Sequence, residues 1–193
     1  MLTDLSKAFD CVVHDLLIAK LHAYGFDLPS LKLINSYLSD RKQRVKIGSS
    51  YSSWNKVDCG IPQGSILGPL FFNIYICDMF LFLENNNIAA YADDNTPYAF
   101  GSNCESVTNS VVKPVNGMKT WFKFNYMKLN SDKCHLILSN LSDHSCVAKI
   151  DSDEIYPSAT EKLLGVEIDS GLTFENHIKA MCSKANIKSK ALS

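Results

Sequence analysis

Apolar residues recur at helical spacing in five stretches of the chain, and residues that start or end helices flank most of them. The predicted helices cover residues 13–24, 29–38, 65–82, 104–125 and the stretch from about 174 onward. Gly25 is expected to end the first helix, because glycine readily adopts the left-handed conformation that follows helix C-termini. Pro114 lies inside the fourth helix and is expected to kink or break it.

Shorter apolar or alternating stretches predict strands between these helices. The first ends at Asp4, and the others cover residues 41–47, 52–57, 88–92, 96–100, 134–139, 147–150 and 163–168. We expect residues 41–57 to form a hairpin around a Gly-Ser-Ser turn. The order of strands and helices predicts an α+β fold, in which helices cover one face of an antiparallel sheet.

The composition allows a substantial core, but its net charge is not the basic one that is usual for nucleic-acid-binding domains. With 193 residues, of which 46% are hydrophobic, the chain can bury a substantial core as one domain. Its 19 basic and 20 acidic residues give a formal net charge of −1, whereas nucleic-acid-binding domains are usually basic. Positive charge is locally dense in residues 41–46 and among the C-terminal lysines. Phosphate contacts and a solvated surface both remain open for residues 41–46, and the solvated surface is favoured for the tail.

Seven cysteines are scattered along the chain without Cys-x-x-Cys spacing. An odd and dispersed set predicts reduced thiols rather than a disulfide framework, and the N-terminus has no signal-peptide pattern. These features predict an intracellular protein of the nucleus, the cytoplasm or both. Residues 66–83 are apolar, but Pro69, Asn73 and Asp78 interrupt them, so a buried helix is favoured over a membrane span.

Two adjacent carboxylates, Asp93 and Asp94, lie between the apolar segments 88–90 and 98–100. Side chains alternate between the faces of a strand, so both can serve one site only at a turn. Unpaired neighbouring carboxylates repel each other, whereas a divalent cation keeps both ionised. The pair therefore indicates either a metal site at a hairpin tip or an exposed turn, in which aspartate is common.

A second acidic block begins the chain, where Asp4 ends an apolar segment and Asp10 precedes a helical pattern. Asp4 is a candidate third metal ligand, although aspartate also accepts hydrogen bonds at helix N-termini. For Asp10 the helix cap is the favoured interpretation.

The third block, residues 60–73, combines a Gly-Ile-Pro-Gln-Gly loop with a strongly apolar helix. Its glycines and proline predict a rigid loop whose backbone can approach a flat partner closely, with Gly64 or Ser65 opening the helix. A nucleotide-binding loop and a plain turn before a core helix are equally compatible with this pattern.

The chain resembles the palm of reverse transcriptases in three blocks that occur in the same order. They are residues 4–10 (Asp-Leu-Ser-Lys-Ala-Phe-Asp), 60–70 (Gly-Ile-Pro-Gln-Gly-Ser-Ile-Leu-Gly-Pro-Leu) and 91–94 (Tyr-Ala-Asp-Asp). The resemblance is closest to the non-LTR, LINE-like retrotransposon branch. Residues 128–134 are similar to the segment after the palm's second helix, and residues 163–178 to the primer-grip hairpin and the entry to the thumb.

This resemblance implies a truncated right-hand polymerase. Residues 1–160 would form the palm, and residues 161–193 the primer-grip hairpin, with Leu164 and Gly165, and the start of the thumb. The chain begins at the first catalytic strand, so the fingers are expected to be missing. The implied partners are an RNA template, a DNA primer and deoxynucleoside triphosphates, with no membrane.

The implied reaction is nucleotidyl transfer to a primer 3′-hydroxyl with two Mg²⁺ ions about 4 Å apart, or with Mn²⁺. Asp4 and Asp93 would bridge the ions. The Leu5 carbonyl would complete the shell, since hard cations accept backbone oxygens. Asp94 would contribute less directly, and its alternative role is to stabilise the turn.

The resemblance also implies substrate-binding residues. Phe9 would be the steric gate against the 2′-hydroxyl, with a core aromatic residue as its alternative. Gln63 and Gly64 would lie against the nucleotide and the template, and Lys133 would neutralise the departing pyrophosphate. Trp54, Trp121 and Phe122 are expected to pack in the core rather than stack on bases.

Two other functions remain open at this stage. One is a catalytically inactive retroelement remnant that binds nucleic acid. The other is a different two-metal enzyme on a palm fold, such as a nucleotide cyclase, which residues 60–64 and the primer-grip-like segment disfavour.

Overall fold

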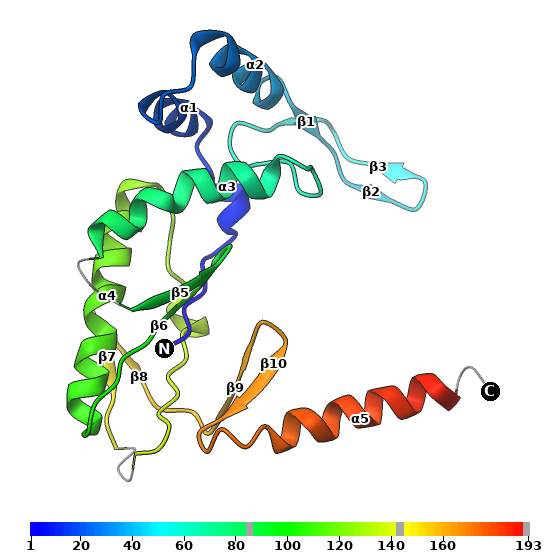
Figure 1. Ribbon diagram of the computed structural model, residues 1–193. Helices are drawn as coiled ribbons and strands as arrows, with labels where there is room; N and C mark the ends of the chain where they lie inside the picture. Colours follow the sequence, from blue (N-terminus) through cyan, green and yellow to red (C-terminus); the bar gives the residue numbers. More distant parts are fainter. Residues whose placement is uncertain (84–86, 142–144, 191–193) are drawn as a thin grey trace. The chain divides into compact units, whose positions relative to one another are not determined.

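The computed structural model describes residues 1–83, 87–141 and 145–190 (Figure 1). The chain divides into two compact units, which are described one at a time. The first unit comprises Met1–Asp4, Asn85–Asn116 and Asn130–Ser193, and the second comprises Leu5–Glu84 and Gly117–Leu129.

The second unit is mainly helical, as its apolar periodicity predicts. Its helices are η1 (Ala8–Cys11), α1 (His14–Ala23), α2 (Leu28–Leu38), α3 (Gly68–Ile76) and η2 (Cys77–Phe82). The Asp27 carboxylate caps α2 by accepting a hydrogen bond from the Ser30 N–H at 3.0 Å. The predicted single helix over 65–82 is wrong in detail. The Ser65 hydroxyl accepts the Gly68 N–H at 2.9 Å, so the helix begins at Gly68, and it continues as a 3₁₀ helix from Cys77.

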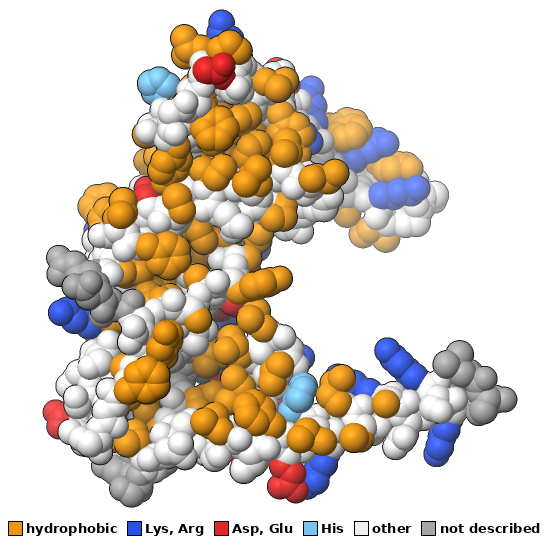
Figure 2. Space-filling model, viewed as in Figure 1, with side chains coloured by type: hydrophobic (Ala, Val, Ile, Leu, Met, Phe, Trp, Pro, Cys, Tyr) orange, Lys and Arg blue, Asp and Glu red, His pale blue; other side chains and the backbone are white. Residues whose placement is uncertain are grey.

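Residues 41–57 form the predicted hairpin, here called the arm. It contains two short ladders, β1 (Lys42–Gln43) with β4 (Asn55–Lys56), and β2 (Lys46–Ile47) with β3 (Ser50–Tyr51). Every residue from 42 to 56 is exposed. Figure 2 shows Lys and Arg side chains interleaved with hydrophobic ones over this part of the chain. The arm therefore adds surface to the second unit without adding to its core.

The core of the second unit is built from large apolar side chains of its helices and of the C-terminal end of α4 (Cys104–Phe124). The largest fully or almost fully buried ones are Leu17, Leu21, Leu38, Phe72, Tyr75, Met79, Met118, Trp121 and Phe122. The packing prediction is thus confirmed for Trp121 and Phe122. It is wrong for Trp54, which is 58% exposed because it lies on the arm.

A buried ammonium group links four elements of this core, α1, α3, η2 and α4. Lys20 Nζ of α1 donates to both carboxylate oxygens of Asp78 at 2.6 and 2.8 Å, and to the Tyr75 carbonyl at 2.8 Å. Trp121 Nε1 donates to the same carboxylate at 3.1 Å, and Lys20 Nζ lies 4.5 Å from the Trp121 ring centroid. Burial lowers the pKa of Lys20, and its bonds to Asp78 oppose that shift. Asp78 therefore offsets the cost of burying the charge.

The first unit combines short antiparallel strand pairs with two long helices. The pairs are β5 (Ile88–Tyr91) with β6 (Asp94–Pro97), β7 (Ala148–Ile150) with β8 (Asp153–Ile155), and β9 (Thr160–Leu163) with β10 (Val166–Asp169). Its helices are α5 (Glu175–Lys190), the part of α4 up to Asn116, and a short η3 at Ser131–Lys133. Figure 2 shows Lys side chains standing out along α5, where every described residue except 177 is exposed.

Two strand predictions for this unit are wrong. Residues 134–139 form isolated bridges at His135 and Leu136 instead of a strand. Residues 163–168 are interrupted by a tight turn at Leu164 and Gly165, both with positive φ, so β9 ends where one continuous strand was expected. A left-handed pair of this kind closes two-residue hairpins.

The described residues form five separate two-stranded ladders rather than one continuous sheet. In the first unit, isolated bridges take the place of a longer ladder. Leu2 pairs with His135, and Thr3 pairs with Asn95. The N-terminal segment therefore lies between β6 and the segment at 135.

Two further expectations concern the first unit. Pro114 does not break α4, which runs from Cys104 to Phe124 with the proline inside it, so a kink is the effect that stays a prediction. Cys104 and Cys146 are joined by a disulfide, contrary to the expectation of reduced thiols. The two cysteines lie 42 residues apart in the sequence but have Cα atoms 6.0 Å apart, which spacing alone could not indicate.

None of the helices in the described parts of the chain has both the length and the apolar character that crossing a bilayer requires.

We expect Asp78→Asn to lower the free energy of unfolding by about 3 kcal/mol, because it leaves the Lys20 ammonium buried without a counter-charge. Urea denaturation measures this change. Asp58→Asn is the matched control, since Asp58 forms an exposed ion pair with Lys56 at 2.9 Å. The control should change stability by less than about 0.5 kcal/mol. Equal effects of the two substitutions would contradict this account of the core.

Candidate active site

The paired aspartates lie at the tip of the β5–β6 hairpin. Tyr91 pairs with Asp94, so Ala92 and Asp93 form the turn, with Ala92 at a φ of 54°. Asp93 is a turn residue as predicted, whereas Asp94 is already the first residue of β6. The second strand therefore begins two residues earlier than predicted. The change from turn to strand lets two adjacent carboxylates leave the backbone in different directions.

Asn95 fixes this tip to the N-terminal segment. Its carbonyl accepts hydrogen bonds from the Thr3 N–H at 2.9 Å and from the Thr3 hydroxyl at 2.7 Å. Its side-chain amide donates to the Asp93 carbonyl at 3.1 Å. Asn95 is only 1% exposed. The residue after Thr3 is Asp4, so this pairing brings the third carboxylate to the hairpin that carries the other two.

Asp4 is held from its other side by residues 130–133. The Asn130 N–H donates to the Asp4 carbonyl at 3.0 Å, and Lys133 Nζ lies 2.8 Å from a carboxylate oxygen of Asp4. The hydrogen bond and the charge of Asp4 raise the pKa of the exposed Lys133 ammonium. Lys133, expected at the pyrophosphate, is thus bound to a predicted metal ligand.

The three carboxylates share one electrostatic environment. Partial burial, followed by the negative charges of Asp93 and Asp4, raises the pKa of the Asp94 carboxyl. Oxygen ligands of this kind suit a hard divalent cation, and the ammonium against Asp4 already occupies a cation-attracting position. Across residues 1–83, 87–141 and 145–190, however, no three His, Cys, Asp or Glu side chains meet in a metal-binding arrangement.

Leu5, the predicted carbonyl ligand, belongs to the second unit. It is 4% exposed and bridges to Leu129. The main-chain bond of this bridge within the second unit runs from the Ser6 N–H to the Lys128 carbonyl at 3.1 Å. The Leu5 carbonyl takes no part in that bond.

In the second unit, the Gly60–Gly64 loop is attached to the segment that carries Phe9. The Gly60 N–H donates to the Val12 carbonyl at 2.7 Å, and the Ile61 N–H donates to the Phe9 carbonyl at 2.9 Å. Gly60 has a φ of 89°, and a Cβ atom there would lie 3.0 Å from the Asp10 backbone. A side chain at this position would therefore separate the loop from its support.

The predicted substrate residues of this unit lie on that support. Phe9 stacks on the buried Phe72 ring at a centroid distance of 4.3 Å, and the Phe9 side chain remains partly exposed. Gln63 Nε2 donates to the Asp10 carboxylate at 3.1 Å, and Gly64 is exposed with a φ of 78°. The prediction that Asp10 caps a helix is wrong, because Val13 precedes α1 and Asp10 lies within η1.

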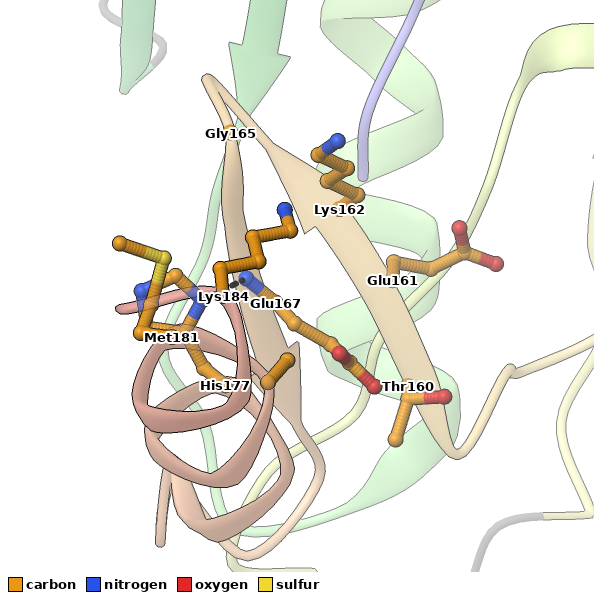
Figure 3. A pocket seen from close by; sticks show the side chains of 9 residues that line it. Thr160, Glu161, Lys162, Gly165, Glu167, His177, Met181 and Lys184 are labelled. Carbon is orange, nitrogen blue, oxygen red and sulfur yellow. Dashed lines mark hydrogen bonds between the residues drawn. The ribbon is translucent and has the colours of Figure 1, made fainter. Parts of the chain in front are cut away.

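The predicted primer-grip residues form the turn of the β9–β10 hairpin, beside α5. Behind this turn lies a cavity of about 340 Å³ (Figure 3). His177 and Lys184 of α5 face Lys162 and Glu167 of the hairpin across it. The Glu167 N–H donates to His177 Nδ1 at 3.3 Å, which fixes the start of α5 against β10.

The chain also matches a known family model. The model described as "Reverse transcriptase (RNA-dependent DNA polymerase)" matches residues 1–168, which is most of the chain. The chain belongs to the reverse transcriptase family. The prediction of a reverse transcriptase domain of the non-LTR retrotransposon branch is thereby confirmed together with the relatives described next.

Relatives of the reverse transcriptase chain include polymerases of insect mobile elements. It is 30% identical over 188 residues to a probable RNA-directed DNA polymerase from transposon BS of Drosophila melanogaster. It is also 30% identical over 192 residues to the RNA-directed DNA polymerase from mobile element jockey of Drosophila funebris. Each match covers 92% of this chain but 20% of the relative. The chain therefore spans about a fifth of the length of these curated relatives.

Three residues of the reverse transcriptase chain have site-building roles that the sequence did not indicate. Asn95 anchors the acidic hairpin, and His14 Nε2 lies 2.7 Å from the Gly60 carbonyl. Asp169 fixes the turn before α5 by accepting the N–H groups of Thr173 and Phe174 at 3.0 and 2.7 Å, bonds that lower the pKa of its carboxyl.

We expect Asp94→Asn to stabilise the metal-free chain at pH 7 by up to about 1 kcal/mol, because it removes a partly buried charge beside two others. The raised pKa means that the folded state binds this proton more tightly than the unfolded state. The wild-type chain therefore loses stability, relative to the variant, as the pH rises above the ordinary value of 3.8.

Thermal unfolding of both proteins between pH 4 and pH 7 measures this difference. Asp153→Asn, at an exposed aspartate of β8, is the control and should show no such trend. A constant difference between Asp94→Asn and the wild type over this range would contradict the clustering of the carboxylates.

Proposed function

We propose that this chain is the palm of an RNA-directed DNA polymerase of a non-LTR retrotransposon, with residues 161–193 as the primer-grip hairpin and the start of the thumb. The observation that carries the proposal is the pairing of Thr3 with Asn95, which brings Asp4 to the hairpin of Asp93 and Asp94. In this proposal the N-terminal segment, β5–β6 and the segment at 135 are the palm sheet. The polymerase would work inside the cell on an RNA template, a DNA primer and deoxynucleoside triphosphates.

Asp4, Asp93 and Asp94 would hold divalent metal. When bound, two Mg²⁺ ions activate the primer 3′-hydroxyl and stabilise the leaving pyrophosphate, and Mn²⁺ can replace them. Lys133 would leave Asp4 as metal neutralises that carboxylate, and its ammonium would then be available to the pyrophosphate oxygens. The ion pair between Lys133 and Asp4 supports this exchange, because it shows that the Asp4 carboxylate already binds a cation, the Lys133 ammonium, which the metal would replace.

The second unit would bind the incoming nucleotide. The partly exposed edge of Phe9, held by Phe72, would pack against the sugar and exclude a 2′-hydroxyl. Gln63 and Gly64 would lie against the nucleotide and the template, with the amide of Gln63 as a hydrogen-bonding group. Leu164 and Gly165, at the exposed turn of β9–β10, would contact the primer strand.

Metal binding can be tested without turnover. We expect Mg²⁺ or Mn²⁺ at ten times its dissociation constant to stabilise the wild-type chain by about 1.4 kcal/mol, measured by thermal unfolding. Asp93→Asn should abolish this effect, and the exposed control Asp153→Asn should retain it. Equal stabilisation of wild type and Asp93→Asn would overturn the assignment of the metal ligands.

Polymerisation is tested by primer extension on an RNA template with Mg²⁺, comparing this chain with a longer, upstream-extended one. Asp93→Asn or Asp4→Asn should reduce extension by about a hundredfold or more, because each removes a carboxylate from the metal site. Extension that survives both substitutions would refute the catalytic assignment. RNA binding without any extension in either chain would instead identify an inactive nucleic-acid-binding remnant.

A further inference from the structure

The arm, residues 41–57, carries aromatic and basic side chains that contribute nothing to the core. Tyr51 and Trp54 are 50% and 58% exposed. The arm contains five lysines and arginines and no aspartate or glutamate, in a chain whose formal net charge is −1. Apolar and charged groups gathered on an exposed element mark a surface for a partner of opposite charge.

The strand register places the rings and the cations on one face. Lys46 is paired with Tyr51, and Lys42 with Lys56, so their side chains point to the same side of the hairpin. Arg44 lies between Lys42 and Lys46 and shares that face. Val45 and Ile47 alternate with these residues and lie on the opposite face, where they are 62% and 78% exposed.

Arg44 holds the two rings in place. Its guanidinium carbon lies 4.0 Å from the Tyr51 ring centroid and 4.5 Å from that of Trp54, and Lys46 Nζ lies 5.4 Å from Tyr51. Stacking against a planar cation orients an aromatic ring and restricts its rotation. About half of each aromatic residue remains accessible, so each ring keeps a surface for a further stacking partner.

We propose that this face of the arm binds a single strand of nucleic acid, with bases stacked on Tyr51 and Trp54 and phosphates near Lys42, Arg44 and Lys46. A single strand presents unstacked bases and phosphates at alternating positions, as this face presents rings and cations. The proposed contact is separate from the carboxylate chemistry and does not require metal.

The arm also leads towards the Gln63 loop within the second unit. A cavity of about 690 Å³ lies at its base, lined by Arg41, Lys42 and Lys56 from the arm and by residues 60–63 from the loop. A strand bound to the arm could therefore continue to Gln63. This continuation rests on the proposed function of the loop, whereas strand binding by the arm does not.

Binding of a fluorescently labelled oligonucleotide to the full chain, without Mg²⁺, tests the proposal. Tyr51→Ala/Trp54→Ala should raise the dissociation constant about tenfold or more, because each base stacked on an aromatic ring contributes substantially to binding. Val45→Ala/Ile47→Ala, which trims exposed apolar side chains on the opposite face, is the matched control and should leave it unchanged. Equal losses in the two double variants, or none in the first, would overturn the proposal.

The charged residues are tested by salt dependence. Arg44→Gln/Lys46→Gln should lower the slope of log K against log salt by about 1.4, since each phosphate contact on a single strand contributes about 0.7. Lys32→Gln/Lys113→Gln makes the same charge change at exposed sites elsewhere and should leave the slope unchanged. An equal change of slope in both double variants would mean that the oligonucleotide is attracted by general positive charge and not by a site on the arm, which would refute the proposal.

Tryptophan fluorescence reports stacking directly. Trp54 and Trp121 are the chain's two tryptophans, and Trp121 is fully buried, so quenching by an oligonucleotide comes from Trp54. Trp54→Phe should lose the quenching but keep the affinity within about threefold. Stronger binding to duplex DNA, or to anionic lipid vesicles, than to single-stranded RNA or DNA would contradict the proposal. Asp93→Asn should bind like the wild type, so that failure here is distinct from failure of the polymerase assignment.

Discussion

The main-chain pairing of the N-terminal segment is the interaction on which the candidate site depends. Leu2 exchanges hydrogen bonds with His135 at 2.7 and 3.0 Å, and Thr3 binds Asn95 through both its N–H and its hydroxyl. These bonds insert one short segment between the acidic hairpin and the segment near Lys133. Without them, Asp4 and Asp93 would be separated by about ninety residues of chain and would share no environment. Backbone hydrogen bonds, rather than side-chain packing, thus bring Asp4 to the hairpin that carries Asp93.

The cost of this arrangement is electrostatic. Partial burial and the negative charges of Asp93 and Asp4 disfavour the charged form of Asp94. One ammonium, that of Lys133, offsets part of the repulsion by binding Asp4. The charge of Lys20 in the second unit is balanced instead. Its buried ammonium forms an ion pair with Asp78 and lies over two aromatic rings. The Lys20 cluster is therefore a structural element, whereas the carboxylate cluster retains unbalanced charge that a ligand can neutralise.

Local patterns in the sequence predicted the elements, and long-range contacts decided the details. Apolar periodicity correctly located α1, α2, α4 and α5, and turn residues located the arm and the acidic hairpin. The start of α3 was misplaced because the Ser65 hydroxyl replaces a helical hydrogen bond, a choice that composition does not reveal. Residues 134–139 have a strand-like pattern but find partners only at single bridges. The roles of Asn95 and His14 depend on Thr3 and Gly60, which lie 92 and 46 residues away, so no local signal could identify them. Trp54 was assigned to the core by its residue type, although its place on an inserted hairpin exposes it.

Localised radical cleavage measures whether Asp4, Asp93 and Asp94 hold metal at one site, as we propose. Fe²⁺ bound in place of Mg²⁺ is oxidised to Fe³⁺ by added hydrogen peroxide, which yields hydroxide and a hydroxyl radical, and the radical cuts the backbone beside the metal. We expect cleavage near residues 4 and 93, the latter giving two fragments of about half the chain, with suppression by excess Mg²⁺ and loss in Asp4→Asn/Asp93→Asn. Cleavage confined to other segments, or unchanged in the double variant, would contradict it.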